Sequence, residues 1–117
     1  MAMTTEELVK IAANAAEEKK AEDLCILNIG KVSVIADYFL IVTANNPSQL
    51  QAITDNVDEK LTRSGIEAKS VEGNGDSAWV LMDYGDFIVH VFDRESRSFY
   101  DLERIWKDAD TVKIEDL

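Results

Sequence analysis

The segment from residue 79 to residue 92 constrains the fold of this chain most strongly. Two apolar runs, 79–83 and 87–92, meet at an Asp-Tyr-Gly-Asp corner. A glycine at the third position of that corner can adopt a positive φ after a type I turn, which is a common way of joining two antiparallel strands. We therefore expect a β-hairpin with Gly85 left-handed and with Asp83 and Asp86 accepting hydrogen bonds from main-chain N–H groups of the turn.

Capping signals mark two helices. Thr4 and Glu7 have the spacing of a capping box, which predicts a helix that runs to about Glu22. Asn46 followed by proline predicts the start of a second helix, which ends at Gly65. Both segments repeat apolar residues at spacings of three and four, so each helix has one face to bury.

Apolar runs outside these helices predict strands. Residues 24–29 and 38–44 are typical of buried strands, and residues 66–72 are predicted to form another, with an edge position as one possibility. Residues 73–76 are predicted to form a turn. Residues 95–108 are expected to form a short helix or two helical turns that bury Leu102, Ile105 and Trp106, followed by a weakly ordered acidic tail at 109–117.

The resulting order, α-β-β-α-β-β-β-α, predicts an α/β (α+β mixed) fold. Strands interleaved with amphipathic helices favour a mixed sheet of about five strands with helices packed on its faces. The 117 residues contain no internal repeat and no Pro/Gly-rich linker. We therefore expect a single domain, residues 1–117, with its core within about 5–108.

The net charge of −11, from 12 Lys+Arg and 23 Asp+Glu, restricts the partners. Nucleic acid and anionic membranes both attract positive charge, so we expect no direct nucleic-acid specificity and no membrane partner. An acidic domain is suited to a basic protein, although solubility alone also explains the charge. The N-terminus lacks the features of a signal peptide and no apolar run approaches the ~20 residues of a membrane span, so we expect a cytoplasmic protein.

The candidate catalytic residues lack supporting motifs. Asp37, Asp83 and Asp86 could serve a metal-dependent nucleotidyl transfer site, but they form no Asp-x-Asp pair and no phosphate-binding loop accompanies them. The single cysteine, Cys25, lies in an apolar run and is expected to be buried. We therefore expect no enzyme activity, no catalytic residue, no cofactor and no metal.

His90 is the only histidine, and three roles are open to it. It could be a general base or metal ligand, a partly buried imidazole bonded to an acid or carbonyl, or part of an exposed contact face. Strand alternation places it with Ile88 and Phe92 on one face of the sheet, and Phe87, Val89 and Val91 on the other.

Aromatic side chains concentrate in the last third of the chain. They are Trp79, Tyr84, Phe92, Phe99, Tyr100 and Trp106. A hairpin and one short helix cannot easily bury them all, and large aromatics ringed by charge are typical of interface hot spots. Trp79, which starts a strand, is expected to be an exposed anchor.

At these residues the chain resembles the ribosomal silencing factor family, also called the Iojap-like family. The resemblance covers about residues 5–108, in the family's order and spacing. Its motifs are Ala36-Asp37-Tyr38-Phe39-Leu40-Ile41-Val42, Val71-Glu72-Gly73, Trp79-Val80-Leu81-Met82-Asp83-Tyr84-Gly85-Asp86, Val89-His90-Val91-Phe92 and Phe99-Tyr100-Asp101-Leu102-Glu103-Arg104-Ile105-Trp106.

The resemblance implies a ribosomal role. It implies binding to the large ribosomal subunit through ribosomal protein uL14 at the intersubunit face, which blocks association with the small subunit and represses translation under nutrient limitation. It also implies a nucleotidyltransferase-like fold without established catalysis, and a homodimer when the protein is free. Organellar relatives act in large-subunit assembly, so an assembly factor remains an alternative, as do a nucleotidyltransferase and a purely structural homodimer.

Clustering and resemblance together locate a partner-binding site on the hairpin and the segment after it. We expect apolar contacts from Trp79, Leu81, His90 and Phe92. We expect Asp83, Asp86, Tyr100 and Glu103 to pair with basic or polar groups. Asp37 and Tyr38 have a structural alternative, which is to close the second strand onto the first helix.

Overall fold

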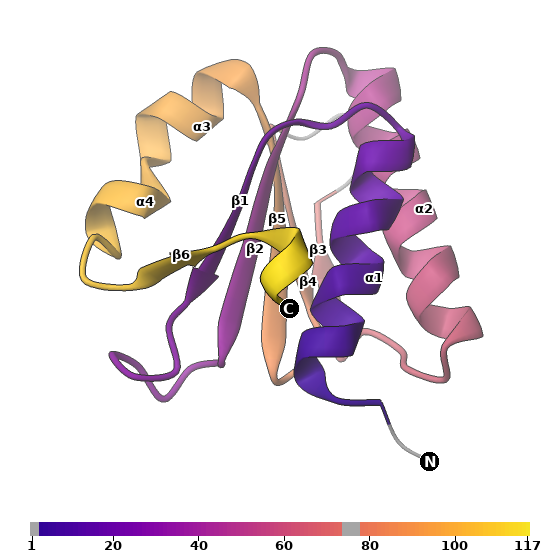
Figure 1. The fold of residues 1–117 in the computed structure, drawn as a ribbon. Coiled ribbons are helices and arrows are strands. Elements are labelled where there is room, and N and C mark those ends of the chain that lie inside the picture. The colour runs from indigo at the N-terminus through magenta and orange to yellow at the C-terminus, as the bar shows by residue number, and fades with distance from the viewer. Residues whose placement is uncertain (1–2, 74–77) are drawn as a thin grey trace.

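A computed structural model describes residues 3–73 and 78–117, and within them a mixed sheet lies between helices (Figure 1). The strand order across the sheet is β3-β4-β5-β2-β1-β6. In chain order the elements are α1 (Thr5–Glu18), β1 (Glu22–Asn28), β2 (Tyr38–Ala44), α2 (Pro47–Arg63), β3 (Ser70–Glu72), β4 (Trp79–Asp83), β5 (Phe87–Asp93), α3 (Arg94–Tyr100), α4 (Leu102–Ile105), β6 (Asp110–Val112) and the 3₁₀ helix η1 (Ile114–Asp116).

The two central strands, β2 and β5, run parallel, and the other paired strands run antiparallel. Every residue of β2 is buried, as is every residue of β5 except its last. A strand covered on both faces exposes neither side to water, which explains the continuous apolar runs of β2 and β5. The predicted α/β class, with a mixed sheet and helices, is confirmed.

The sheet has a core on each face. Helices α1 and α2 cover one face, where Phe87, Val89 and Val91 join the larger core (Figure 1). On the other face, Ile88 and Phe92 belong to a second, smaller core that Leu102 and Trp106 partly cover. The predicted alternation along β5 is therefore confirmed.

The capping predictions hold at both helices. Glu7 N–H donates to Thr4 Oγ1 at 3.1 Å, completing the capping box of α1. Asn46 Oδ1 accepts from the first turn of α2, and Gly65 follows the end of that helix with a φ of +93°. The first helix ends at Glu18, earlier than predicted, because Lys20 turns the chain with a φ of +63°.

The hairpin forms as expected. Gly85 has a φ of +90°, and its N–H donates to Asp83 Oδ1 at 2.8 Å. Asp86 differs from the prediction: among the described residues its carboxylate accepts no N–H of the turn. Its main-chain oxygen accepts from Asp37 N–H at 2.7 Å and joins the hairpin tip to the segment before β2. Tyr38 is buried in the core that α1 and α2 cover, in agreement with the structural alternative given for it.

Two predictions for the C-terminal part are wrong. Residues 110–112 pair with β1 as a sixth strand, with Ile26 opposite Val112, where a weakly ordered tail was expected. Residues 95–108, expected to form a short helix or two helical turns, contain two short helical segments, which Asp101 separates with a φ of +44°. Ile105 of α4 is 67% exposed, whereas it was expected to be buried.

Other differences are small. The strand expected at 66–72 covers only Ser70–Glu72 and is an edge strand, and the strand expected at 24–29 covers Glu22–Asn28. Cys25, expected to be buried, is half-buried against the second core, where burial raises the pKa of its thiol. Of the predicted turn at 73–76, only Gly73 lies within the described residues. Within the described residues, 3–73 and 78–117, none of the helices is long and apolar enough to cross a membrane.

Candidate functional site

Aromatic rings from β2, β4, β5, α3 and the end of α4 gather on the sheet face opposite α1 and α2. We call this group the aromatic cluster; its members are Phe39, Trp79, His90, Phe92, Tyr100 and Trp106. Trp79 lies opposite Phe92 across the β4–β5 pair, and their ring centroids are 5.1 Å apart. The ring centroid of Tyr100, in α3, lies 4.7 Å from that of Trp79. The cluster therefore joins the hairpin to the segment that follows it.

His90 is a buried, neutral member of this cluster. Its side chain is 3% exposed, and burial lowers the pKa of the imidazole from 6.5 to about 4. Trp79 Nε1 donates to His90 Nδ1 at 3.1 Å, so the single imidazole proton of the neutral form belongs on Nε2. Among the described residues, Nε2 has no hydrogen-bond partner. Of the three roles considered, the buried imidazole is observed, with an indole as its partner where an acid or carbonyl was expected.

Trp79 is less exposed than predicted. Its indole is partly buried because Phe92 and Tyr100 lie against it and His90 accepts its hydrogen bond. Leu81 is also partly buried, and Phe92 is almost completely buried. The hairpin residues of the predicted site therefore form the floor of a surface, with α3 and α4 beside it.

One arginine fixes α3 and α4 to the sheet. Arg97 is only 11% exposed and forms a two-pronged pair with Glu103, with Nε–Oε1 and Nη2–Oε2 distances of 3.0 and 3.1 Å. Its guanidinium also donates to Thr43 Oγ1 of β2 at 2.9 Å and to the main-chain oxygen of Asp23 at 2.7 Å. Asp23 is left-handed, with a φ of +50°, where the β1–β2 register is interrupted.

This arrangement was missed by the sequence analysis. The Arg97–Glu103 pair spans the break at Asp101, so it follows neither the i,i+3 nor the i,i+4 spacing of a helix and leaves no recognisable pattern. Glu103 was expected to be available to a partner. In the structure its carboxylate already binds Arg97.

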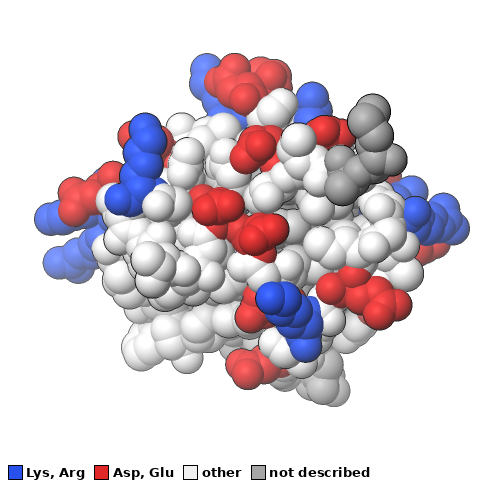
Figure 2. All heavy atoms as spheres, turned by 90° about the horizontal axis from the view of Figure 1, so that it is seen from below, with Lys and Arg blue, Asp and Glu red and all other residues white. Residues whose placement is uncertain are grey.

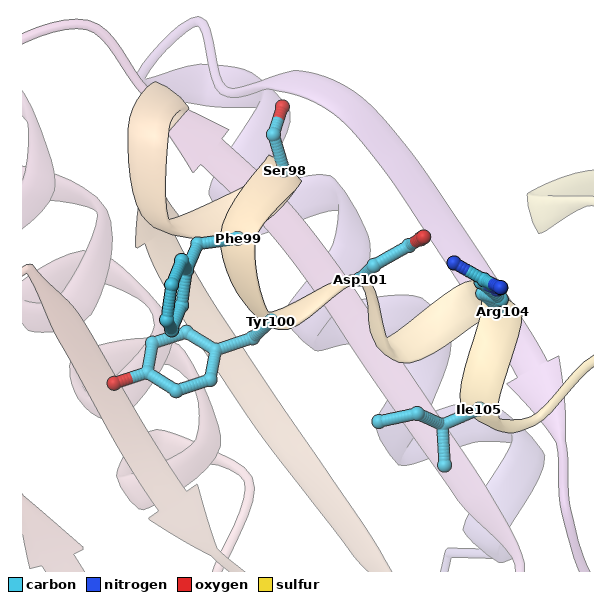
Figure 3. Close-up of a pocket in the computed structure, with 6 residues that line it drawn as sticks. All are labelled: Ser98, Phe99, Tyr100, Asp101, Arg104 and Ile105. Atoms are coloured by element: carbon cyan, nitrogen blue, oxygen red, sulfur yellow. The ribbon is translucent and has the colours of Figure 1, made fainter.

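The outer side of α3 and α4 exposes apolar side chains (Figure 3). Phe99 is 79% exposed, and together with Tyr100 and Ile105 it lines a shallow groove of about 420 Å³. Figure 3 shows the Phe99 and Tyr100 rings next to each other, while Asp101 and Arg104 point toward one another from the break and from α4. The expectation that some aromatics remain exposed is confirmed for Phe99 and Tyr100.

The three acids considered for nucleotidyl transfer have different surroundings. Asp83 Oδ1 accepts the turn hydrogen bond from Gly85. Asp37 and Asp86 are exposed and line a second groove, of about 410 Å³, at the end of the sheet. Within residues 3–73 and 78–117, no group of three or more His, Cys, Asp or Glu side chains is placed to hold a metal ion.

Comparison with known proteins identifies the family. The family model described as "Ribosomal silencing factor during starvation" matches residues 2–117. The chain belongs to the ribosomal silencing factor family. It is 44% identical over 113 residues to a ribosomal silencing factor of Halalkalibacterium halodurans, covering 97% of each chain, and 41% identical over 113 residues to one of Bacillus subtilis, covering 97% of this chain and 96% of the relative.

A solved structure agrees with this assignment. A protein from Chromobacterium violaceum superposes with a TM-score of 0.86 at 32% identity, covering 90% of this chain and 88% of that one. The predicted resemblance to the silencing factor family is thus confirmed. In this member of the family, the predicted hairpin residues lie beneath or beside a surface whose most exposed apolar groups, Phe99 and Ile105, were not among those predicted.

Proposed function

We propose that this chain binds the large ribosomal subunit and blocks its association with the small subunit, which represses translation. The observation that carries the proposal is the silencing-factor match along nearly the whole chain. The structure adds a surface suited to a protein partner, because exposed aromatic and aliphatic side chains adjoin a rigid aromatic floor.

The proposed partner is ribosomal protein uL14 at the intersubunit face of the large subunit. Support for a basic protein partner comes from the net charge of −11. Opposite charge speeds the encounter of two proteins and disfavours wrong partners, even where it adds little affinity. The same charge opposes binding to bare RNA.

The eight predicted site residues take graded roles in this proposal. Tyr100 and the accessible parts of Trp79 and Leu81 contact the partner, while Phe92 and His90 support them from beneath. Asp86 is exposed and pairs with a basic group, and Asp83 holds the hairpin turn. Glu103 acts through Arg97, because their pair fixes α4, which has no buried residue of its own.

No chemical step is needed for silencing. A body of about 13 kDa that occupies the position of a subunit bridge excludes the other subunit sterically. Occupied large subunits are then withdrawn from the joining equilibrium by mass action. We propose that the chain acts in the cytoplasm, without catalysis, and that it is a homodimer when free.

Co-sedimentation with purified subunits tests the proposal. We expect the chain to travel with large subunits and not with small ones. Phe99→Asp should weaken this binding by about tenfold or more, since a charge would replace a highly exposed apolar contact. Val71→Asp is the matched control, because Val71 is also exposed but lies on the edge strand β3. Absence of binding by the unmodified chain would refute the proposal.

A further inference from the structure

The loop between β1 and β2 exposes aliphatic side chains at the end of the sheet. Val34 is fully exposed, Ile35 is 58% exposed, and Val32 is also exposed. The loop lies at the lower left of Figure 1, and Figure 2 looks onto this end of the molecule from below, where acidic and basic groups lie within a largely uncharged surface. These side chains contribute to neither core of the sheet.

Hydrogen bonds hold the loop in one conformation. The main-chain oxygen of Asp37 accepts from Ile29 and Gly30, at 2.9 and 3.2 Å. Ser33 N–H donates to Ile29 O at 2.9 Å, and Asp37 N–H donates to the hairpin at Asp86 O. An apolar loop with a fixed main chain loses little conformational entropy when a partner covers it.

The groove of about 410 Å³ between this loop and the hairpin tip combines apolar and acidic groups. Val34 and Ile35 line it from the loop, and the exposed Asp37 and Asp86 line it beside them. In the described part of the chain neither carboxylate has an ion-pair partner. The Lys69 side chain lies near Gly85 but forms no ion pair with them.

We infer that this groove receives an arginine or lysine side chain from a basic protein of the large ribosomal subunit. Two uncompensated carboxylates complement a cationic head group, and the aliphatic side chains complement the methylene stem below it. A second copy of this chain fits less well, because it carries the same excess of negative charge. The inference rests on the proposed function and extends the pairing proposed for Asp86, because Asp37, Val34 and Ile35 of the same groove lie outside the predicted site.

The test compares two groove variants with matched controls in binding to isolated large subunits. Val34→Asp is paired with Val71→Asp, and Asp86→Asn is paired with Asp108→Asn, since all four side chains are exposed. We expect each groove variant to bind at least about fivefold more weakly than its control. The affinity of Asp86→Asn should also fall less steeply with salt than that of the unmodified chain, because one interfacial ion pair is lost.

The possible outcomes separate the inference from the proposed function. If the unmodified chain binds no large subunit, the proposed function fails. If it binds and both groove variants match their controls, the inference alone is overturned. If Val34→Asp leaves subunit binding unchanged and alters only the mass of the free chain, measured by sedimentation equilibrium, the groove holds a second copy and the inference is also overturned.

Discussion

Burial of His90 predicts that acid destabilises this fold in a specific pH window. The folded-state pKa of about 4 lies below the ordinary value of 6.5, so protons bind the unfolded chain first as the pH falls. The contribution of the His90 imidazole to the free energy of unfolding is fully present above pH 6.5 and is lost progressively as the pH falls toward 4. Each pH unit in that window corresponds to about 1.4 kcal/mol, so the loss at pH 5 is about 2 kcal/mol relative to pH 7.5.

Urea denaturation of the unmodified chain and of His90→Gln at pH 7.5 and pH 5 measures this loss. The variant keeps an acceptor for the Trp79 indole N–H but cannot be protonated, so carboxylates that titrate in the same range affect both proteins equally. We expect the free energy of unfolding to fall by about 2 kcal/mol more in the unmodified chain. Equal losses in the two proteins would refute the assignment of His90 as a buried neutral imidazole.

Three further perturbations test how the fold holds the site. Arg97→Ala should lower the free energy of unfolding by about 2–3 kcal/mol, since it removes hydrogen bonds to the buried Thr43 hydroxyl and to the Glu103 carboxylate. It should also speed amide hydrogen exchange in α3 and α4, and unchanged exchange would contradict the anchoring role of Arg97. Gly85→Ala and Gly65→Ala should each lower the free energy of unfolding by about 1 kcal/mol, because both positions have positive φ. At Gly85 the new Cβ would lie 2.9 Å from Lys69 Cε, but that flexible side chain can move aside, so we expect similar losses in urea denaturation. No loss at either glycine would be inconsistent with the structure. Deleting residues 110–117 should free the edge of β1 and promote self-association seen by light scattering; a monodisperse deletion variant as stable as the full chain would argue against β6.

Local signals were sufficient for much of the fold. The capping box at Thr4, the Asn46 cap and the glycine corner at Gly85 each determine backbone geometry through a few neighbouring residues, and all three appear as predicted. Period-two alternation correctly assigned the two faces of β5 because both faces are packed.

Features that depend on distant segments could not be predicted. Strand β6 has three residues and forms because the edge of β1 is available opposite Val112. The break between α3 and α4 occurs at Asp101 and not at a glycine, so the sequence gives no usual sign of it. The Arg97–Glu103 ion pair joins these two separate helices and therefore has no helical spacing. Alternation placed His90 on its face, but its burial requires rings from other elements, such as Phe39 of β2.

The position of the exposed surface on α3 and α4 could not be predicted for the same reason. Sequence clustering drew attention to residues 79–106, but it could not show that Trp79 and Phe92 pack against Tyr100. The exposed groups of α3 and α4 became visible only in the structure, because the break at Asp101 decides how the two short helices are oriented.

The most direct test of the central claim is a subunit-joining measurement. Purified large subunits are incubated with increasing amounts of the chain before small subunits are added, and the products are separated on a sucrose gradient. We predict that joined ribosomes decrease in proportion to the chain that migrates with large subunits. Normal joining when every large subunit carries the chain would contradict steric exclusion as the mechanism.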